Sequence, residues 1–361
     1  MLYYLLYPLH EQVGAFNVFR YITFRGALAA LTALLLSLTL GDWVIRRLQE
    51  MQVGQSIRAE GPQTHHAKAG TPTMGGLLIV AAVVIPTLLW VDLRNHLIWV
   101  LLGSTVLFAM VGFWDDYLKV IRRRSEGLRP RAKFALQVLV ALGVGVALVW
   151  LSEIGSFSTV LSVPFFKSFR PDLGWFYVAF IVLVLVGSAN AVNLTDGLDG
   201  LAIGSVLIAS GTFGILTYVA GNAIVADYLA VENVKQAGEL TIFCGALVGA
   251  SLGFLWFNCN PAQVFMGDVG SVALGGAIGT LAVLIKQEVL LLLVGGLFVL
   301  EAASVILQVA SFRMTGRRIF RMAPIHHHFE LMGWAEPKVI IRLWILALIF
   351  SLLALSTLKL R

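Results

Sequence analysis

Charged side chains are scarce in this sequence, and the shortage excludes an ordinary soluble domain. Asp, Glu, Lys and Arg make up 13% of the 361 residues, whereas 58% are hydrophobic. Soluble domains usually carry about 25% charged residues, so a water-facing surface cannot be built from so few. The mean hydropathy of +0.86 indicates instead a helical membrane protein.

Cysteine is also rare, and the start of the chain lacks positive charge. Cys244 and Cys259 are the only two cysteines, which excludes a disulfide scaffold or a cysteine-rich metal site; we expect both to be packing residues. The first 19 residues contain no Lys or Arg, so the charged start of a cleavable signal peptide is missing. The net charge is +6, and the Lys and Arg residues cluster between the apolar runs. This distribution is typical of loops that face anionic lipid and does not indicate a nucleic-acid-binding protein.

Long apolar runs dominate what is present. A spanning helix needs about 20 largely apolar residues, and ten ranges qualify: 21–40, 75–93, 97–114, 134–151, 175–192, 199–220, 239–257, 269–285, 289–311 and 339–358. We therefore predict an all-α, polytopic integral membrane protein with about ten transmembrane helices. Residues 1–361 are expected to form a single transmembrane domain, without an internal repeat.

The connections between these spans differ in positive charge. The odd-numbered connections carry sixteen Lys and Arg residues and the even-numbered ones five. Cytoplasmic loops are enriched in Lys and Arg, which places the odd connections in the cytoplasm and both termini in the periplasm. The unusual polar motifs played no part in this assignment, yet all lie in odd connections. We predict one cytoplasmic active site formed by segments 41–74, 115–133, 193–198, 258–268 and 312–338.

Three acidic residues in different connections suggest a metal site. Asp115 and Asp116 end the third span, and if this end is helical Lys119 shares a face with them, which an ion pair at a helix end would also explain. Adjacent acids at a membrane boundary are costly, however, and a bound cation would relieve the cost. Asp268 could by itself be a helix N-cap. Together the three supply hard oxygen ligands, which suit Mg²⁺ with a phosphate-bearing substrate and do not suit zinc.

A second polar cluster ends the fifth span. Asn190, Asn193, Asp196 and Asp199 occur within ten residues, with a glycine after each Asp. A capped turn with Asp196 or Thr195 as N-cap would explain one Asp but not the whole set. Glycines in such a segment allow a ligand or a backbone to approach closely. We interpret the segment as part of the substrate site.

The last odd connection is rich in histidine and arginine. His326, His327 and His328 are consecutive, so at most two can share a face. With nearby arginines they resemble a phosphate-binding surface, although a solvated basic loop is the alternative. In the preceding span, Glu301 is an intramembrane acid, which is either functional or a hydrogen-bonded structural residue. The Gly295–Gly296 pair could bend that span.

These groups together favour phosphoryl transfer. A magnesium site of several acids, surrounded by basic and amide groups at the membrane–cytoplasm boundary, suits a soluble, phosphate-rich substrate and a phosphate-bearing lipid.

At these residues the sequence resembles the polyprenyl-phosphate N-acetylhexosamine-1-phosphate transferases. The resemblance covers nearly the whole chain and is carried by the motifs GTPTMGG (70–76), NLTDGLDG (193–200), FMGD (265–268) and PIHHH (324–328). It implies ten spans with both termini outside, in a bacterial inner membrane, and a homodimer. It also implies that UDP-MurNAc-pentapeptide and undecaprenyl phosphate react to give undecaprenyl-diphospho-MurNAc-pentapeptide, known as lipid I, and UMP.

The resemblance assigns roles to individual residues. Asp268 resembles the Mg²⁺ ligand with Asp115 and Asp116 beside it, and Asp115 is alternatively the base for the lipid phosphate. The expected catalytic set also includes Lys119, Lys133 and His327. The expected substrate-binding set is Lys68, Asn190, Asn193, Asp196, Leu198, Asp199, Asn258, Phe265, Gln308, His326 and His328.

Two alternatives stay open at this point. The sister enzymes that use UDP-N-acetylglucosamine are similar, but the His triplet favours the MurNAc-pentapeptide substrate. A proton-coupled transporter could use Glu301 as a proton relay. Transporters place such acids near the membrane midplane and often contain repeats, whereas the acids here lie at one boundary.

Overall fold

The computed structural model describes residues 1–51, 70–120, 122, 127–163 and 169–359. Within these ranges the regular elements are helices, and an isolated β-bridge joins Val160 to Asp172. The elements are, in order, α1 (Leu2–Leu6), η1 (Tyr7–Glu11), η2 (Gly14–Arg20), α2 (Ile22–Glu50), α3 (Gly76–Trp90), α4 (His96–Val120), α5 (Pro130–Glu153), α6 (Phe176–Thr195), α7 (Leu201–Gly221), α8 (Ala223–Tyr228), η4 (Ala237–Glu239), α9 (Leu240–Asn258), α10 (Gly267–Leu284), α11 (Leu291–Val294), α12 (Gly296–Thr315), α13 (Ile325–Leu331) and α14 (Glu336–Ser356).

The all-α, multi-span architecture predicted from the sequence is confirmed. In the described part of the chain, nine helices are long and apolar enough to cross a membrane, namely α2, α4, α5, α6, α7, α9 with η4, α10, α12 and α14. Each of the ten predicted ranges contains a helix, but α3 has only 15 residues. At about 1.5 Å per residue it is about 22 Å long, which is shorter than the hydrocarbon core of about 30 Å.

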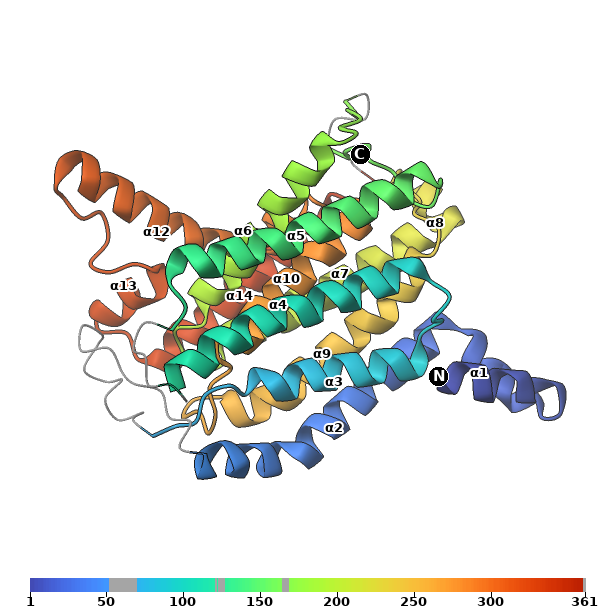
Figure 1. Cartoon of the computed structure of the whole chain (residues 1–361), viewed down its shortest axis with the longest axis horizontal. Helices are drawn as coiled ribbons and strands as arrows, with labels where there is room; N and C mark the ends of the chain where they lie inside the picture. The colour runs from blue at the N-terminus through green and yellow to red at the C-terminus, as the bar shows by residue number, and fades with distance from the viewer. Residues whose placement is uncertain (52–69, 121, 123–126, 164–168, 360–361) are drawn as a thin grey trace.

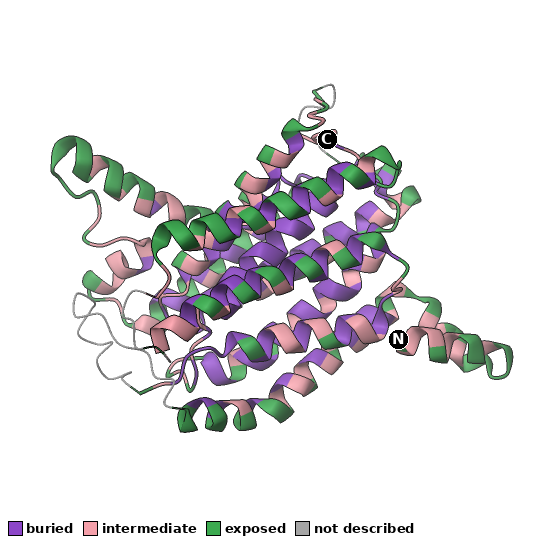
Figure 2. Cartoon of the chain, viewed as in Figure 1, coloured by how far each residue is buried: buried purple, intermediate pink, exposed green. Residues whose placement is uncertain are grey.

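Helix α10 lies at the centre of the bundle, and small residues let its neighbours approach. Its apolar stretch is 94% buried, and Figure 2 shows the buried residues concentrated in the middle of the molecule. Gly112 of α4 lies against the backbone of Asp268, and Gly275 of α10 lies against the backbone of α6 at Ser188 and Ala189. Close backbone packing of this kind holds helices together in lipid, where apolar burial gives little drive.

The outer helices are apolar on their outward faces as well. Leu35, Leu139 and Leu183 belong to three different spans, and each is more than half exposed. A helix that is apolar all round requires an apolar surrounding, which the lipid provides. Of the two cysteines, Cys244 is buried as expected. The expectation for Cys259 was wrong, because this residue follows the end of α9 and is exposed.

The bundle end formed by the even-numbered connections is braced by buried ion pairs. Arg25 of α2 donates to both carboxylate oxygens of Glu239, at 2.8 and 2.6 Å. The Lys286 ammonium lies 3.0 Å from Glu288 Oε1 and donates to the Tyr177 hydroxyl at 2.7 Å. Buried charges must be paired to be tolerated, so these contacts fix the helix ends there and explain the polar residues without a ligand.

Helix α12 leaves the bundle. The helical path is interrupted at Gly295, between α11 and α12, which is the position where the sequence suggested a bend. Of the residues that the structure describes in α12, the buried ones are Gly296, Leu297, Phe298, Glu301 and Ser304. All five lie in its first half, and Figure 1 shows the second half projecting away from the other helices.

Candidate active site

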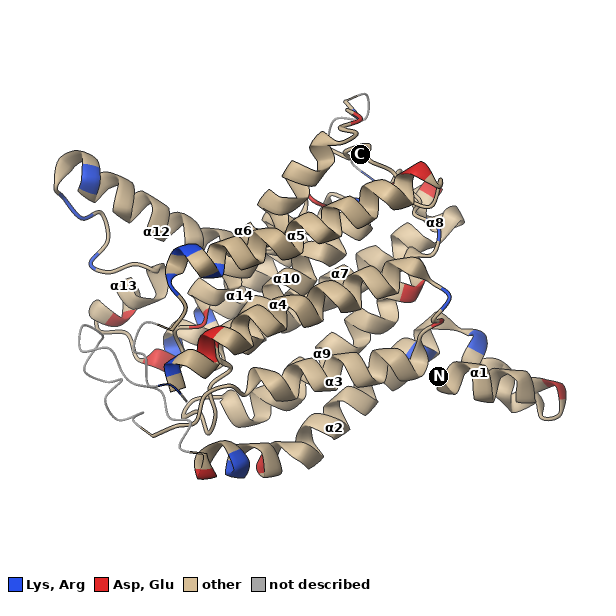
Figure 3. Ribbon diagram, in the orientation of Figure 1, with Lys and Arg blue, Asp and Glu red and all other residues tan. Residues whose placement is uncertain are grey.

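The described parts of the five odd-numbered connections meet at one end of the bundle. The backbone nitrogen of Gly75 donates to Phe265 O at 2.9 Å, and Gly200 N donates to Asn258 Oδ1 at 3.1 Å. The Asp199 nitrogen donates to Glu336 Oε1 at 3.1 Å, which adds the start of α14. Figure 3 shows charged residues gathered where α4 ends and α5 begins. Segments distant in sequence are therefore side by side here.

Three buried carboxylates form the centre of this end. Asp115 and Asp116 lie in the last turns of α4, and Asp268 lies in the first turn of α10. Each offers one oxygen, and these atoms all lie within 4.8 Å of one another. The close approach of the two helices at Gly112 places the acids together. This acidic triad, defined as Asp115, Asp116 and Asp268, is the arrangement that the sequence predicted for a metal site.

Two lysines bridge the carboxylates of the triad. The Lys119 Nζ lies 2.5 Å from Oδ2 of Asp115 and 2.5 Å from Oδ2 of Asp268. The Lys133 Nζ lies 3.0 Å from the same oxygen of Asp268 and 3.5 Å from that of Asp115. The shared face predicted for Lys119 and Asp115 is confirmed. Counted with every group ionised, three carboxylates face two ammonium groups, which leaves one negative charge in excess.

Backbone amides and a glycine hold the two acids of α4. Leu128 N donates to Asp115 Oδ1 at 2.8 Å, and Val269 N donates to Asp116 Oδ2 at 3.0 Å. Gly267 has a φ of +72°, and a Cβ there would lie 2.6 Å from Asp116 Oδ2. Only glycine adopts this conformation readily and leaves room for the carboxylate, which explains the glycine before Asp268.

Asn193 and Ser271 orient the third acid. The Asn193 amide nitrogen donates to Asp268 Oδ1 at 2.5 Å and to the Ser271 hydroxyl oxygen at 2.7 Å. The structure thus joins Asn193, which the sequence predicted as a substrate-binding residue, to the triad. Ser271 was missed by the sequence reasoning, although its position three residues after Asp268 places both on one helical face. That spacing was the available signal.

Asp196 ends α6 beside the triad. It is the C-cap of that helix, and Gly200 is the N-cap of α7, so the alternative of Asp196 or Thr195 as the N-cap of the next helix was wrong. Removal from water, together with the nearby carboxylates of Asp268, Asp116 and Asp199, raises the pKa of Asp196 to about 8. A neutral Asp196 can donate a hydrogen bond as well as accept one.

Other predicted residues brace the loops around the triad. Asp199 Oδ2 accepts from Asn260 Nδ2 at 3.2 Å and from Ala262 N at 3.1 Å. The Asn258 amide nitrogen donates to Val264 O at 2.8 Å. Leu198 is buried against a small apolar cluster next to α14. These residues tie the segment after α6 to the segment before α10.

Phe265, Asn190 and Gln308 have distinct surroundings. Phe265 is half-buried, and its backbone nitrogen donates to Pro72 O at 2.8 Å. Asn190 donates to Gln137 Oε1 at 2.7 Å, which ties α6 to α5 one turn from Asn193. Gln308 bonds the backbone at residues 319 and 320 through both ends of its amide. In the described structure the hydrogen-bond partners of Asn190 and Gln308 thus lie outside the triad.

The His triplet divides between the interior and the surface of the site. His326 is fully buried, with its Nδ1 3.1 Å from Glu301 Oε2. His327 Nδ1 lies 2.7 Å from Glu330 Oε2, and His328 Nδ1 accepts from Arg321 N at 3.1 Å. The three rings therefore have different partners, in line with the expectation that they could not share one face. Lys68 lies outside the described residues.

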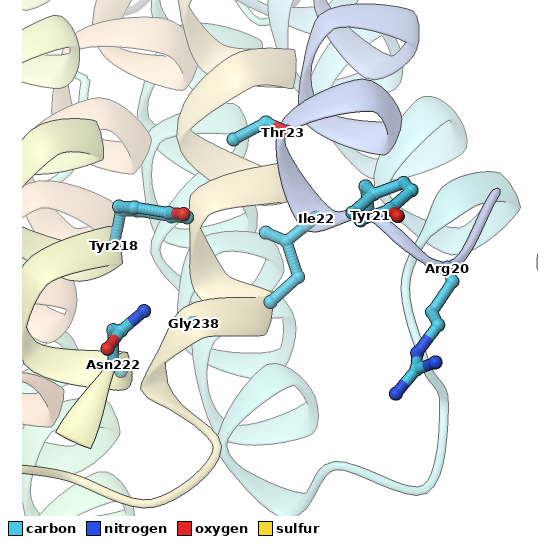
Figure 4. Close-up of a pocket in the computed structure, with 8 residues that line it drawn as sticks. Arg20, Tyr21, Ile22, Thr23, Tyr218, Asn222 and Gly238 are labelled. Carbon is cyan, nitrogen blue, oxygen red and sulfur yellow. The ribbon is translucent and has the colours of Figure 1, made fainter. Parts of the chain in front are cut away.

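A separate hollow lies far from the triad. It has a volume of about 240 Å³ and sits where η2 joins α2, against the end of α7 (Figure 4). Its lining residues are Arg20, Tyr21, Ile22, Thr23, Tyr218, Gly221, Asn222 and Gly238, none of which is acidic. This hollow is therefore unsuited to metal-dependent phosphate chemistry, and the acidic triad is the candidate active site.

Two regions of the chain match models of known protein families. Residues 98–286, more than half of the chain, match glycosyl transferase family 4. Residues 68–80 match the phospho-N-acetylmuramoyl-pentapeptide-transferase signature 1. The family match contains Asp115, Asp116 and Asp268, so the triad lies inside the shared region.

Full-length relatives define the group more narrowly. Proteins named phospho-N-acetylmuramoyl-pentapeptide-transferase are 60% identical in Desulfatibacillum aliphaticivorans, 57% in Geobacter sp. (strain M21) and 56% in Koribacter versatilis (strain Ellin345). Each alignment covers 100% of this chain and 100% of the relative. The chain therefore belongs to glycosyl transferase family 4 and, within it, to the phospho-N-acetylmuramoyl-pentapeptide-transferases.

Proposed function

We propose that this protein transfers phospho-MurNAc-pentapeptide from UDP-MurNAc-pentapeptide to undecaprenyl phosphate, which yields lipid I and UMP. The observation that supports this most directly is the buried acidic triad, whose oxygens lie within 4.8 Å of one another at the end where the motif-bearing connections meet. The names of the full-length relatives support the same reaction.

The triad suits Mg²⁺. Its ligands are carboxylate oxygens, which hard cations prefer, and its two lysines leave one negative charge uncompensated. Asp115 and Asp116 also lie at the carboxyl end of α4, where the helix dipole favours a cation. Asp115, Asp116 and Asp268 would hold the ion, which when bound would offset the charge that develops on the transferring phosphate.

The chain's own polar groups would handle the diphosphate. Lys119 and Lys133 lie on the triad with their ammonium groups free to pair with phosphate oxygens once an ion satisfies the carboxylates. The first turn of α10 also presents backbone N–H groups near Asp268, and a helix N-terminus favours phosphate. His327, on α13, is a further donor for the phosphates or sugar.

The uridine end of the donor would lie along the turn between α6 and α7. In our proposal Asp196, kept protonated at neutral pH by its raised pKa, donates to a uracil carbonyl. Phe265 supplies an apolar surface nearby. Lys68, Asn190, Leu198, Asp199, Asn258, Gln308, His326 and His328 complete the proposed substrate-binding set, several of them by holding loops rather than by contact.

The lipid substrate would approach along α12. The projecting half of this helix exposes Ile306, Leu307 and Phe312, which are apolar and suited to a polyprenyl chain. Because α12 leads to the loop that carries α13, a lipid lying along it would bring its phosphate toward the end of the bundle that holds the triad.

The two alternatives have less support. A proton-coupled transporter would need acids near the midplane, whereas the triad lies at the ends of α4 and α10. A transferase for UDP-N-acetylglucosamine would use the same triad, so the names of the full-length relatives decide between the two sugars.

A transfer assay with the purified protein tests the proposed function. Radiolabelled UDP-MurNAc-pentapeptide and undecaprenyl phosphate should give label in the lipid extract and an equal amount of UMP, both requiring Mg²⁺. UDP-N-acetylglucosamine run in parallel should give none. Transfer from UDP-N-acetylglucosamine alone would overturn the choice of sugar, and absence of any labelled lipid would remove the enzyme proposal.

We also propose ten membrane crossings in the bacterial inner membrane, with the site in the cytoplasm and both termini in the periplasm. This assigns a crossing to the short α3 and makes residues 1–361 one transferase domain. The sixteen Lys and Arg residues of the odd connections, against five elsewhere, support this orientation. The site would then comprise segments 41–74, 115–133, 193–198, 258–268 and 312–338.

Thiol labelling of intact cells checks the orientation. A cysteine introduced at Arg318, in the last odd connection, should resist a membrane-impermeant reagent until the cells are opened. A cysteine at Asn222, in an even connection, is the matched control and should react from outside at once. The native Cys259 must first be replaced by serine, because it is exposed. Labelling of position 318 from outside would reverse the proposed topology.

A further inference from the structure

Glu301 and His326 form a buried pair to which the proposed reaction assigns no chemical step. The Glu301 Oε2 lies 3.1 Å from His326 Nδ1, and both side chains are 0% exposed. Among the described residues, the other carboxylate oxygen of Glu301 and the Nε2 of His326 have no hydrogen-bond partner. Burying such groups without full pairing is costly, which makes the pair a candidate for a role beyond packing.

The His326 ring attaches α13 to the protein interior, together with Phe329, which packs against the apolar cluster around Leu198. Within α13, every residue of which the structure describes, His326 is the single buried residue. His327 also pairs with Glu330 within the helix, and His328 accepts from Arg321 N in the preceding loop. Among the residues of α13, His326 makes the most deeply buried contact with another helix, through Glu301 of α12.

The ring also contacts the turn that follows α6. A methyl group built on Gly197 would overlap the His326 imidazole at Nε2, so the ring lies directly against this backbone. Gly197 adjoins Asp196, which stands beside the triad. His326 is thus held between Glu301 of α12 on one side and the substrate turn on the other.

Glu301 is well placed to fix this arrangement. It lies in the buried first half of α12, just after the break at Gly295, and α12 has no buried residue beyond Ser304 in the described structure. By accepting a hydrogen bond from Nδ1–H, a carboxylate sets both the orientation and the tautomer of an imidazole. The ring then presents a bare Nε2 to the turn.

We propose that Glu301 is a positioning residue, which through the His326 ring docks α13 against the turn at Gly197 and so sets the distance of His327 from the triad. The inference rests on the proposed function, since it concerns the same site. Glu301 itself touches neither substrate nor metal ligand. Its effect is transmitted by one hydrogen bond and one ring contact.

A double-mutant cycle tests the pairing. Glu301→Ala and His326→Ala should each lower kcat/KM for the nucleotide substrate by about a hundredfold, the scale of a misplaced active-site element. The KM for undecaprenyl phosphate should stay at its wild-type value. Because the two residues act as a unit, the double variant should be no worse than the worse single variant. Additive losses would overturn the proposal.

Matched variants separate positioning from folding. Ser304→Ala removes another buried polar group from α12, whose hydroxyl bonds only its own helix at Glu301 O, and should leave activity unchanged. Glu301→Gln keeps an acceptor oxygen and should recover most of the activity lost in Glu301→Ala. If Glu301→Gln were as inactive as Glu301→Ala at an unchanged unfolding midpoint, a hydrogen bond to the ring could not be the cause.

Gly197→Ala tests the contact on the other side of the His326 ring and leaves Glu301 intact. In the wild-type protein the added methyl group should displace the ring and lower the transfer activity. In the His326→Ala variant the same change should lower the activity no further. An equal cost in both backgrounds would contradict the ring contact. Absence of phospho-sugar transfer by the wild-type protein would contradict the proposed function. Full activity of the Glu301→Ala variant would contradict only the positioning role of Glu301.

Discussion

Replacing Asp268 by Asn is expected to remove nearly all transfer activity while the protein stays folded. The change conserves size, and the Asn oxygen can still accept from Asn193. It removes the anionic ligand of the triad and the charge partner of Lys119 and Lys133. Electrostatic groups at the reacting phosphate are usually worth about 10²–10³-fold in kcat, and we expect a loss at the upper end because metal and lysines are affected together.

The measurement is transfer of labelled sugar phosphate as a function of Mg²⁺, with the thermal unfolding midpoint recorded on the same samples. Asp227→Asn is the matched control, since Asp227 is an exposed acid on α8, in an even connection outside the proposed site segments. It should behave as wild type. Near-normal turnover of Asp268→Asn at saturating Mg²⁺ would show that Asp268 is not a metal ligand.

Asp115→Asn is expected to be slow but measurable, with a deficit that shrinks as the pH rises. Direct attack by the lipid phosphate needs an oxygen nucleophile in line with the bond to UMP. A phosphomonoester has its second pKa at about 6, so the lipid phosphate is mostly ionised near neutral pH and ionises unaided at higher pH. A base at Asp115 is thus helpful but dispensable. The Asn oxygen can still accept from Leu128 N, which preserves the loop.

The same mechanism predicts no UMP release without the lipid substrate. A carboxylate nucleophile would have to approach an anionic diphosphate and then be displaced by a second anion, and both encounters are repulsive unless a cation screens them. Delipidated wild-type protein given UDP-MurNAc-pentapeptide alone should therefore release none. A stoichiometric burst of UMP, with label retained on Asp115 or Asp116, would establish a covalent intermediate instead.

Much of the fold could be predicted because lipid imposes a simple length rule. A run of apolar residues long enough to span the membrane must be helical, since its backbone groups have no other partners there. The ten ranges accordingly each contain a helix. The break at Gly295 and the outward course of α12 could be only partly foreseen, because they depend on which helix faces pack together. Those choices are set by glycine contacts such as that of Gly112 with Asp268.

The candidate site was predictable where residue type alone restricts the chemistry. Adjacent acids at the end of a span have few roles, so the triad could be found before its geometry was known. The lysine bridges, the Asn193–Ser271 contact and the loop-bracing bonds of Asp199 and Gln308 depend instead on side-chain directions across different loops. Sequence spacing carries no information on contacts between side chains of different segments, such as Lys119 with Asp268.

The outward course of α12 has a consequence for how the reaction rate depends on its surroundings. If the polyprenyl substrate reaches the triad sideways along Ile306 and Phe312, it never enters water, and its bulk concentration has no meaning for the enzyme. What governs encounter is its mole fraction among the other lipids or detergent molecules. The nucleotide substrate, by contrast, follows ordinary solution kinetics. The same catalytic centre thus meets one substrate by diffusion within the membrane and the other by diffusion in solution. Adding inert lipid should therefore lower the transfer rate when the total amount of each substrate is constant.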